Sequence, residues 1–204
     1  MTSIVVLKNL MKDFLSEYTF SNKEYFTQIS VPKFTSSLIL RETLEKKYGI
    51  CMDLNFTFSK ILTMHGFNNY LVKAYEQKPD GNFYDVYHLS IIVMINNRKY
   101  LADVGFGDHF FEPIPIRHKT IVGKIKVDVL DANKVYDIYT QNKLIVRVHD
   151  QAITDIGDIN DNYQKFYKST ANDFPLCRKL YERIFDPINN QFVPITKKII
   201  RDEI

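Results

Sequence analysis

The sequence contains no tryptophan, and cysteine, glycine and proline are all scarce. Of its 204 residues only two are cysteine, seven are glycine and seven are proline. The cysteines, Cys51 and Cys177, lie far apart and form no Cys-x-x-Cys pair, so neither a disulfide framework nor a zinc site is expected. So few glycines and prolines argue against a flexible linker. A reducing cytoplasm is the simplest location for such a chain.

Long apolar runs and a strong charge of one sign are also missing. No apolar stretch of about 18 residues is present, so no membrane-spanning helix and no membrane partner are expected. The first residues lack the basic start, apolar core and cleavage site of a signal peptide. The formal net charge is only +3, and the basic residues are scattered, so no nucleic-acid partner is expected. Mild basicity would suit an anionic substrate or cofactor.

Hydrophobic and aromatic residues are plentiful, at 45% and 14%, which is typical of a chain that buries a core. Apolar residues at helical spacing predict helices over 3–18, 37–48 and 51–65. Thr2 or Ser3 and then Ser36 are the expected N-caps, and Gly49 and Gly66 are the expected left-handed residues that follow two of the helices.

The pattern changes after the third helix. Alternating residues predict strands over 68–77, 86–95, 99–107, 124–132, 134–140 and 143–149. Turns are expected at 78–81, Asn96-Asn97, Asn133 and Asn142, and helical patterns return over 158–169 and 175–185. Helices, then strands, then helices predict an α+β fold with an N-terminal helical bundle, an antiparallel β-sheet or barrel and a short C-terminal α region. The corresponding segments, 1–66, 67–150 and 151–204, would form one compact catalytic unit.

Cys51 stands at the start of the third predicted helix. The unpaired amides of a helix N-terminus carry partial positive charge, which favours a thiolate. Cys51 could therefore be a nucleophile, or it could be a small buried core residue. Cys177, in a predicted amphipathic helix, is interpreted as a packing residue.

A cysteine nucleophile needs a base, and His88 is the best candidate among the histidines. His65 lies at the far end of the Cys51 helix, about 20 Å away. His88 lies in an apolar strand, where a polar ring needs a partner. The hairpin around Asn96-Asn97 brings Asp103 beside it, and that carboxylate would hold Nδ1–H while the other ring nitrogen faces a thiol. The hairpin alone does not place Cys51 nearby.

Three segments, YGICMDLN, VYHLSIIVMINNRKYLADVGFG and FYKSTAND, resemble the signature regions of arylamine N-acetyltransferases. Cys51, His88 and Asp103 fall on the family's Cys-His-Asp triad with matching intervals, and the residue at position 55, an asparagine, matches as well. The resemblance covers residues 40–110 well and 160–176 loosely, and it implies a shortened member with a cysteine-protease-like fold. Lys47 and Asp53 replace the family's arginine and glutamate, and they are expected to form an ion pair that braces the loop.

The resemblance implies a function and further site residues. It implies acyl transfer from acetyl-CoA, through an acetyl-cysteine, to a small aromatic amine or hydrazine, without a metal. The Met52 amide would donate to the oxyanion. The implied coenzyme A-binding residues are Tyr84, Asp85, Tyr167, Ser169 and Thr170. The implied acceptor-binding residues are Tyr87, Gly105, Phe106 and Gly107. Loop, cap or packing roles are the alternative for each of these residues.

Other functions remain open on the sequence. A transglutaminase-like or cysteine-protease-like hydrolase, or an amide synthase, would use the same triad. A trimmed, non-catalytic homologue that binds a partner is a third possibility. The sequence predicts neither the acceptor amine nor the oligomeric state.

Overall fold

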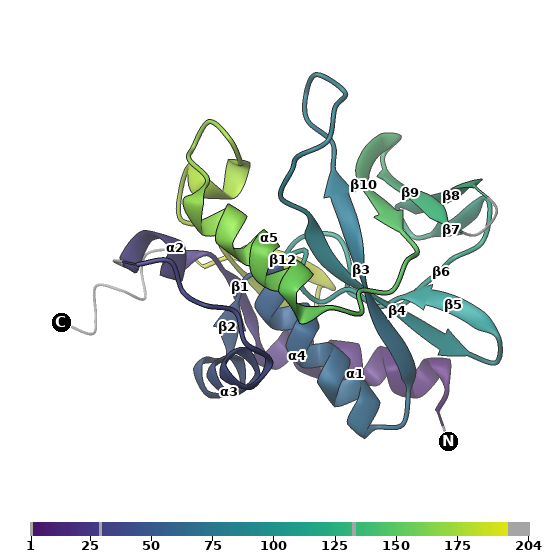
Figure 1. Ribbon diagram of the computed structural model, residues 1–204. Coiled ribbons are helices and arrows are strands. Elements are labelled where there is room, and N and C mark those ends of the chain that lie inside the picture. The colour runs from purple at the N-terminus through teal and green to yellow at the C-terminus, as the bar shows by residue number, and fades with distance from the viewer. Residues whose placement is uncertain (1, 29, 132–133, 196–204) are drawn as a thin grey trace.

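Figure 1 shows a computed structural model of the protein, which describes residues 2–28, 30–131 and 134–195. Its helices pack beside a curled antiparallel sheet. In chain order the helices are α1 (Ile4–Glu17), α2 (Lys23–Thr27), α3 (Ser36–Lys46), α4 (Cys51–Met64), α5 (Ile156–Lys168) and the 3₁₀ helix η1 (Pro175–Cys177). The strands are β1 (Thr19–Ser21), β2 (Tyr48–Gly49), β3 (Asn68–Glu76), β4 (His88–Ile95), β5 (Arg98–Leu101), β6 (Ile114–Pro115), β7 (Thr120–Val122), β8 (Ile125–Asp131), β9 (Val135–Thr140), β10 (Lys143–His149), β11 (Glu182–Asp186) and β12 (Gln191–Pro194).

The larger sheet has eight strands in the order β6-β5-β4-β3-β10-β9-β8-β7, and all of its neighbouring strands are antiparallel. A smaller sheet, β12-β11-β1-β2, brings residues 19–21 next to residues 182–186. The predicted α+β fold with an antiparallel, barrel-like sheet is confirmed.

Helix α4 lies in the middle of the molecule (Figure 1) and is buried around most of its circumference, as expected for a helix with apolar residues on several faces. Leu54, Phe58 and Leu62 pack against α1 and β4. Met52 and Phe56 pack in a second cluster that includes α5. Because close-packed neighbours surround α4, its first turn is held rigidly.

Two predicted hairpin turns are confirmed. Asn96 and Asn97 both have positive φ, 50° and 59°, between β4 and β5. Gln141 and Asn142, between β9 and β10, also have positive φ, 49° and 63°. Positive φ at both central residues is typical of the two-residue turn whose twist matches a β-hairpin. The predicted turn at Asn133 lies outside the described residues.

The predicted helix over 175–185 is wrong. The chain makes only the short η1 there and then continues as β11, which pairs with β1 and β12. The side chain of Asn22 explains the difference, because it bonds three backbone groups of this segment. It donates to the carbonyls of Leu176 (2.6 Å) and Lys179 (3.0 Å) and accepts from the amide of Tyr181 (2.7 Å). These long-range contacts override the helical spacing.

The predicted ends of the first three helices are partly confirmed. The Ser3 hydroxyl accepts from the amide of Val6 (3.3 Å) at the start of α1, and Gly66 has a φ of +79° after α4. Ser36, however, is the first residue of α3 and not its cap, and the left-handed residue after α3 is Lys47 (φ 59°). Gly49 instead lies in β2.

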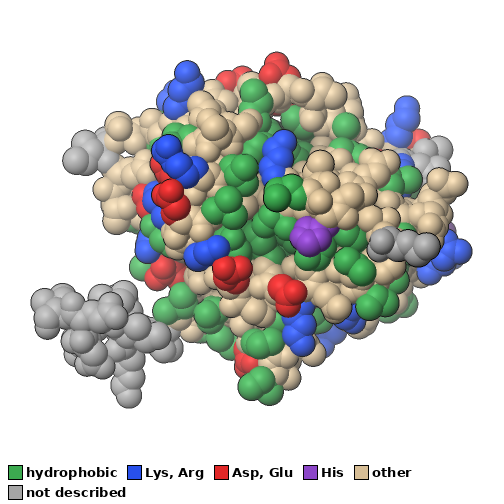
Figure 2. Space-filling model, turned by 90° about the horizontal axis from the view of Figure 1, so that it is seen from below, with side chains coloured by type: hydrophobic (Ala, Val, Ile, Leu, Met, Phe, Trp, Pro, Cys, Tyr) green, Lys and Arg blue, Asp and Glu red, His purple; other side chains and the backbone are tan. Residues whose placement is uncertain are grey.

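On the face seen from below in Figure 2, apolar side chains occupy much of the central area, and Lys, Arg, Asp and Glu are spread around it. Single exposed apolar side chains, such as Met64 at 86% exposure, are ordinary on a protein surface. None of the described helices combines the length and the apolar character that a membrane crossing requires.

Candidate active site

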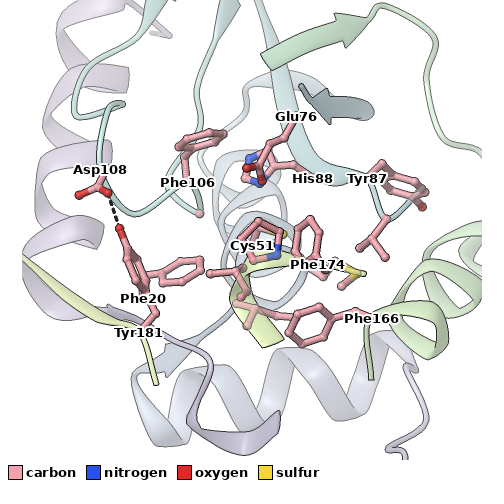
Figure 3. A pocket seen from close by; sticks show the side chains of 16 residues that line it. Phe20, Cys51, Glu76, Tyr87, His88, Phe106, Asp108, Phe166, Phe174 and Tyr181 are labelled. Carbon is pink, nitrogen blue, oxygen red and sulfur yellow. Dashed lines mark hydrogen bonds between the residues drawn. The ribbon is translucent and has the colours of Figure 1, made fainter. Parts of the chain in front are cut away.

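Cys51 is the first residue of α4 and is 8% exposed. Ile50 is the N-cap residue and has an extended conformation. Cys51 is therefore the first residue with helical conformation. The side chain of Cys51 lies in the wall of a cavity together with His88 (Figure 3). Unpaired amides of the first turn therefore place partial positive charge next to the thiol.

His88 is the first residue of β4 and is 5% exposed. Its Nε2 lies 2.6 Å from Oδ2 of Asp103, and the ring also makes a side-chain hydrogen bond with Cys51. The predicted orientation of the ring is wrong: Asp103 holds Nε2, which leaves Nδ1 for the thiol. Although burial disfavours the imidazolium, the charges of Asp103 and Cys51 raise the pKa of His88 well above its usual value. A protonated His88 beside the Cys51 thiol is therefore favoured.

Asp103 follows β5 and is 1% exposed. The predicted return strand ends at Leu101, and the chain from Ala102 onwards forms a loop against the start of α4. Burial raises the pKa of Asp103, but the His88 cation and several hydrogen bonds outweigh it and hold that pKa below its usual value. The carboxylate is therefore ionised and stabilises a protonated His88.

Four donors surround the Asp103 carboxylate. Oδ2 accepts from the Ser90 hydroxyl (2.5 Å) as well as from His88. Oδ1 accepts from the Asn55 amide (2.9 Å) and from the backbone N–H of Gly105 (2.9 Å). Asn55 thus ties the second turn of α4 to the loop, and its Oδ1 also accepts from the amide of residue 104 (2.9 Å).

Sequence reasoning missed Ser90, although a signal was available. Ser90 stands two residues after His88 in an otherwise apolar strand, and residues two apart lie on the same face of a strand. Ser90 and His88 therefore both point toward Asp103.

The cavity beside Cys51 has a volume of about 190 Å³. Three of the four predicted acceptor residues, Tyr87, Gly105 and Phe106, line it. Phe106 presents its ring to His88 with centroids 5.0 Å apart. A Cβ at Gly105 would lie 2.7 Å from Cα of Cys51, so only glycine permits this approach. Gly107 is not part of the lining, and it has a φ of +84° beside the ring of Phe20.

The predicted coenzyme A residues do not all come together. Tyr84, Asp85 and Ser169 line a second, more open groove that shares Val86 with the cavity. The hydroxyl of Thr170 donates to the carboxylate of Asp173 (2.8 Å), which follows in the same turn.

Tyr167 lies away from that groove. It packs against Tyr163 and Phe166, with ring centroids 4.9 Å and 5.3 Å away. Its role as a coenzyme A ligand stays a prediction, as do the roles of the other cofactor and acceptor residues.

The cysteine at position 177 is 5% exposed and packs with residues of α5, among them Phe166. Burial raises the pKa of its thiol. A buried, un-ionised thiol fits the predicted packing role.

The predicted ion pair between Lys47 and Asp53 is wrong. The ammonium of Lys47 binds Glu17 (2.9 Å) and the hydroxyl of Tyr18 (2.9 Å) instead, because Lys47 is the left-handed residue after α3 and points toward α1. Asp53 reaches back to accept from the amide of Ile50 (2.9 Å), which supports the first turn of α4. The Asp53 side chain also explains Gly49, where a Cβ would lie 2.6 Å from Cβ of Asp53.

Asp53→Asn is expected to stabilise the fold more at pH 8 than at pH 5. Burial raises the pKa of Asp53 from 3.8 to about 7, against the opposing effect of the Ile50 hydrogen bond. Between pH 3.8 and about pH 7, the Asp53 carboxyl keeps its proton in the folded state but has lost it in the unfolded state. The free energy of unfolding of the wild type therefore decreases as the pH rises through this range, by up to about 4 kcal/mol. Asparagine keeps the acceptor oxygen without the charge. The measurement is the difference in Tm between variant and wild type, which should grow by roughly 5–10 °C from pH 5 to pH 8. An equal difference at both pH values would contradict the argument.

Comparisons with known proteins show the family of the chain and its fold. The model of the N-acetyltransferase family matches residues 3–176. Two uncharacterized acetyltransferases of Acanthamoeba polyphaga mimivirus are similar in sequence. One is 54% identical over 190 residues, covering 91% of this chain and 93% of its own length. The other is 46% identical over 200 residues, covering 96% and 94%.

Solved structures share the fold. Arylamine N-acetyltransferase C from Bacillus anthracis superposes with a TM-score of 0.79 at 17% identity, covering 97% of this chain and 80% of its own. The arylamine N-acetyltransferase of Mycobacterium marinum gives a TM-score of 0.76 at 16% identity, covering 90% and 71%.

Proposed function

Because the chain belongs to the arylamine N-acetyltransferase family, we propose that it transfers an acetyl group from acetyl-CoA to a small aromatic amine or hydrazine. The transfer passes through an acetyl thioester on Cys51. The observation that carries the proposal is the hydrogen-bonded series Asp103–His88–Cys51 at the wall of a cavity.

The first half-reaction acetylates Cys51. Its thiolate attacks the thioester carbonyl of acetyl-CoA, a bond forms between Sγ and the carbonyl carbon, and the thiolate of coenzyme A leaves with the proton held by His88. The Met52 amide lies in the first turn of α4, at the positive end of the helix, and stabilises the oxyanion. Loss of one such donor typically costs about 3–4 kcal/mol.

The second half-reaction acetylates the acceptor. The amine nitrogen attacks the carbonyl of acetyl-Cys51, Nδ1 of His88 accepts the amine proton, and the Cys51 thiolate leaves as the amide forms. Asp103 holds the proton on Nε2, so that Nδ1 keeps its lone pair for this step.

The open groove that includes Tyr84, Asp85 and Ser169 is the proposed site for coenzyme A. Four cationic side chains also line it, those of Lys78, Lys165, Lys168 and Arg178. The described residues provide no ion pair for any of the four, so they are available to the phosphates of the coenzyme. Because this groove meets the cavity at Val86, a pantetheine chain would reach from one to the other.

Intact-mass measurement after incubation with acetyl-CoA tests the proposal. The wild-type protein is expected to gain one acetyl group, and Cys51→Ala is expected to gain none. Cys177→Ala is the matched control, since it removes the other thiol, and it should keep the adduct. If acetyl-CoA gives no adduct but p-nitrophenyl acetate acylates Cys51, the proposed donor is wrong and a hydrolase is favoured. If neither reagent acylates Cys51, the nucleophile itself is wrong.

A further inference from the structure

Glu76, the last residue of β3, is a carboxylate in the wall of the cavity for which the proposed reaction has no use. The register of β3 and β4 pairs Ala74 with His88. Glu76 stands two residues beyond Ala74, on the same face of the sheet. Figure 3 shows Glu76 beside His88 and above Cys51. The carboxylate therefore borders the space that an acceptor would occupy.

The Glu76 carboxylate makes no hydrogen bond or ion pair with a described residue, and its side chain is half-buried in the cavity wall. Asp103 and Cys51 already engage the neighbouring His88. Burial, together with the negative charge of Asp103, raises the pKa of Glu76 above its usual value against the opposing effect of the His88 charge. A carboxylate that has lost part of its hydration and has no hydrogen-bond partner is costly, so a cation that entered the cavity would be stabilised beside it.

Apart from His88, which Asp103 and Cys51 already engage, the cavity wall supplies no cation. Its other acidic residue, Asp108, already accepts from the hydroxyl of Tyr181 and lies 3.4 Å from the guanidinium of Arg183. Lysine and arginine are absent from the lining, which otherwise consists mainly of apolar side chains. The unpaired negative charge of Glu76 thus faces an apolar pocket in which charge pairing is strong.

We propose that Glu76 is a specificity residue that selects an acceptor with a positively charged group beside its reacting nitrogen, such as an aromatic amine that also bears an ammonium group. The inference rests on the proposed acetyl transfer. The reacting nitrogen must be neutral to attack acetyl-Cys51, so the charge that Glu76 binds belongs to a second group on the same molecule. A charged hydrogen bond to Glu76 then holds the acceptor against the thioester.

Three anilines with different para substituents test the proposal: 4-(aminomethyl)aniline is cationic at pH 7.5, 4-ethylaniline is a neutral molecule of similar shape, and 4-aminobenzoate is anionic. The wild-type enzyme, with p-nitrophenyl acetate as donor, is expected to show the highest kcat/KM for the cationic probe. The ammonium group withdraws electrons from the ring and makes its aniline nitrogen a weaker nucleophile, so intrinsic reactivity would give the opposite order.

Glu76→Gln is expected to lower the cationic-to-neutral ratio of kcat/KM by about 10- to 100-fold and to leave the neutral probe nearly unchanged. Glu76→Met serves as a second neutral variant, and acetylation of Cys51 reports that each variant is folded. Glu45→Gln, at an exposed site on α3, controls for the change in overall charge and should keep the ratio. An unchanged ratio in both Glu76 variants would overturn the proposal. Failure of acetyl-CoA to load Cys51 would instead count against the proposed donor, because p-nitrophenyl acetate loads the thiol independently.

Discussion

Asp103→Asn is expected to lower kcat/KM for acetyl transfer by about 10³- to 10⁴-fold. The reason lies in the donors around the carboxylate, two on each oxygen: His88 and Ser90 on Oδ2, Asn55 and Gly105 on Oδ1. Asparagine offers one acceptor oxygen and one NH₂ group. In either orientation its NH₂ group must face two donors.

Both orientations of the asparagine amide disable the site. If the NH₂ group faces His88, the ring must turn Nε2 into an acceptor, and the proton moves to Nδ1, which then cannot accept the amine proton. If the NH₂ group faces Asn55 and the Gly105 amide, the loop loses the bonds that hold it against α4. Buried donors left without acceptors cost about 1–3 kcal/mol each.

The pH dependence of Cys51 alkylation by iodoacetamide separates this effect from simple unfolding. The charge of Asp103 is one cause of the raised pKa of His88. Its loss makes the imidazolium less stable, so the thiolate of Cys51 forms at higher pH and the alkylation midpoint shifts upward. A variant with the wild-type midpoint would contradict the assigned role.

The matched control for this substitution is Asp137→Asn. Asp137 is 2% exposed and lies in β9, where its carboxylate binds the guanidinium of Arg147 through two bonds of 2.7 and 2.8 Å. Its replacement should lower Tm but change kcat/KM by less than about twofold, because none of these atoms lines the cavity. Loss of activity in this variant would mean that any buried aspartate matters equally.

The sequence alone predicts the half of the site that depends on local pairing. Asn96-Asn97 sets the turn, the strand alternation sets the register, and together they place Asp103 beside His88. The position of Cys51 relative to this pair depends on contacts between α4 and the sheet, which no local pattern encodes. The resemblance to a known family, and not periodicity, predicted that convergence.

What the sequence did not predict also depends on long-range contacts. Asn22 holds residues 176–181 through side-chain bonds that span more than 150 positions, so helical spacing in that segment was misleading. The orientation of the His88 ring depends on the position of the Asp103 carboxylate, and the Asn55 amide holds that carboxylate in place. Glu76 stands at the end of an amphipathic strand, where an acidic residue ordinarily faces solvent.

Gly105→Ala is expected to lower kcat/KM by at least about a hundredfold and to destabilise the fold by about 1–3 kcal/mol. A Cβ at this position would lie 2.7 Å from Cα of Cys51 and 2.8 Å from Nδ2 of Asn55. The φ of Gly105 is not in the left-handed region, so space, and not conformation, excludes alanine. One of the two contacts is with backbone, which no rotamer change relieves.

Two movements of the backbone could relieve the close contact in Gly105→Ala, and each would disturb the triad. Either the loop that follows β5 moves away from α4, which lengthens the bond from Asn55 to Asp103, or the first turn of α4 moves and carries Cys51 away from His88. The measurements are kcat/KM, the rate of Cys51 alkylation at neutral pH, and Tm, with all three expected to fall. Gly157→Ala is the control, because the atoms nearest to its Cβ belong to the side chain of Asp155, at 3.1 Å or more, and Gly157 does not line the cavity. If Gly105→Ala kept wild-type alkylation and turnover, the close approach of this loop to the nucleophile would not matter for the geometry of the triad.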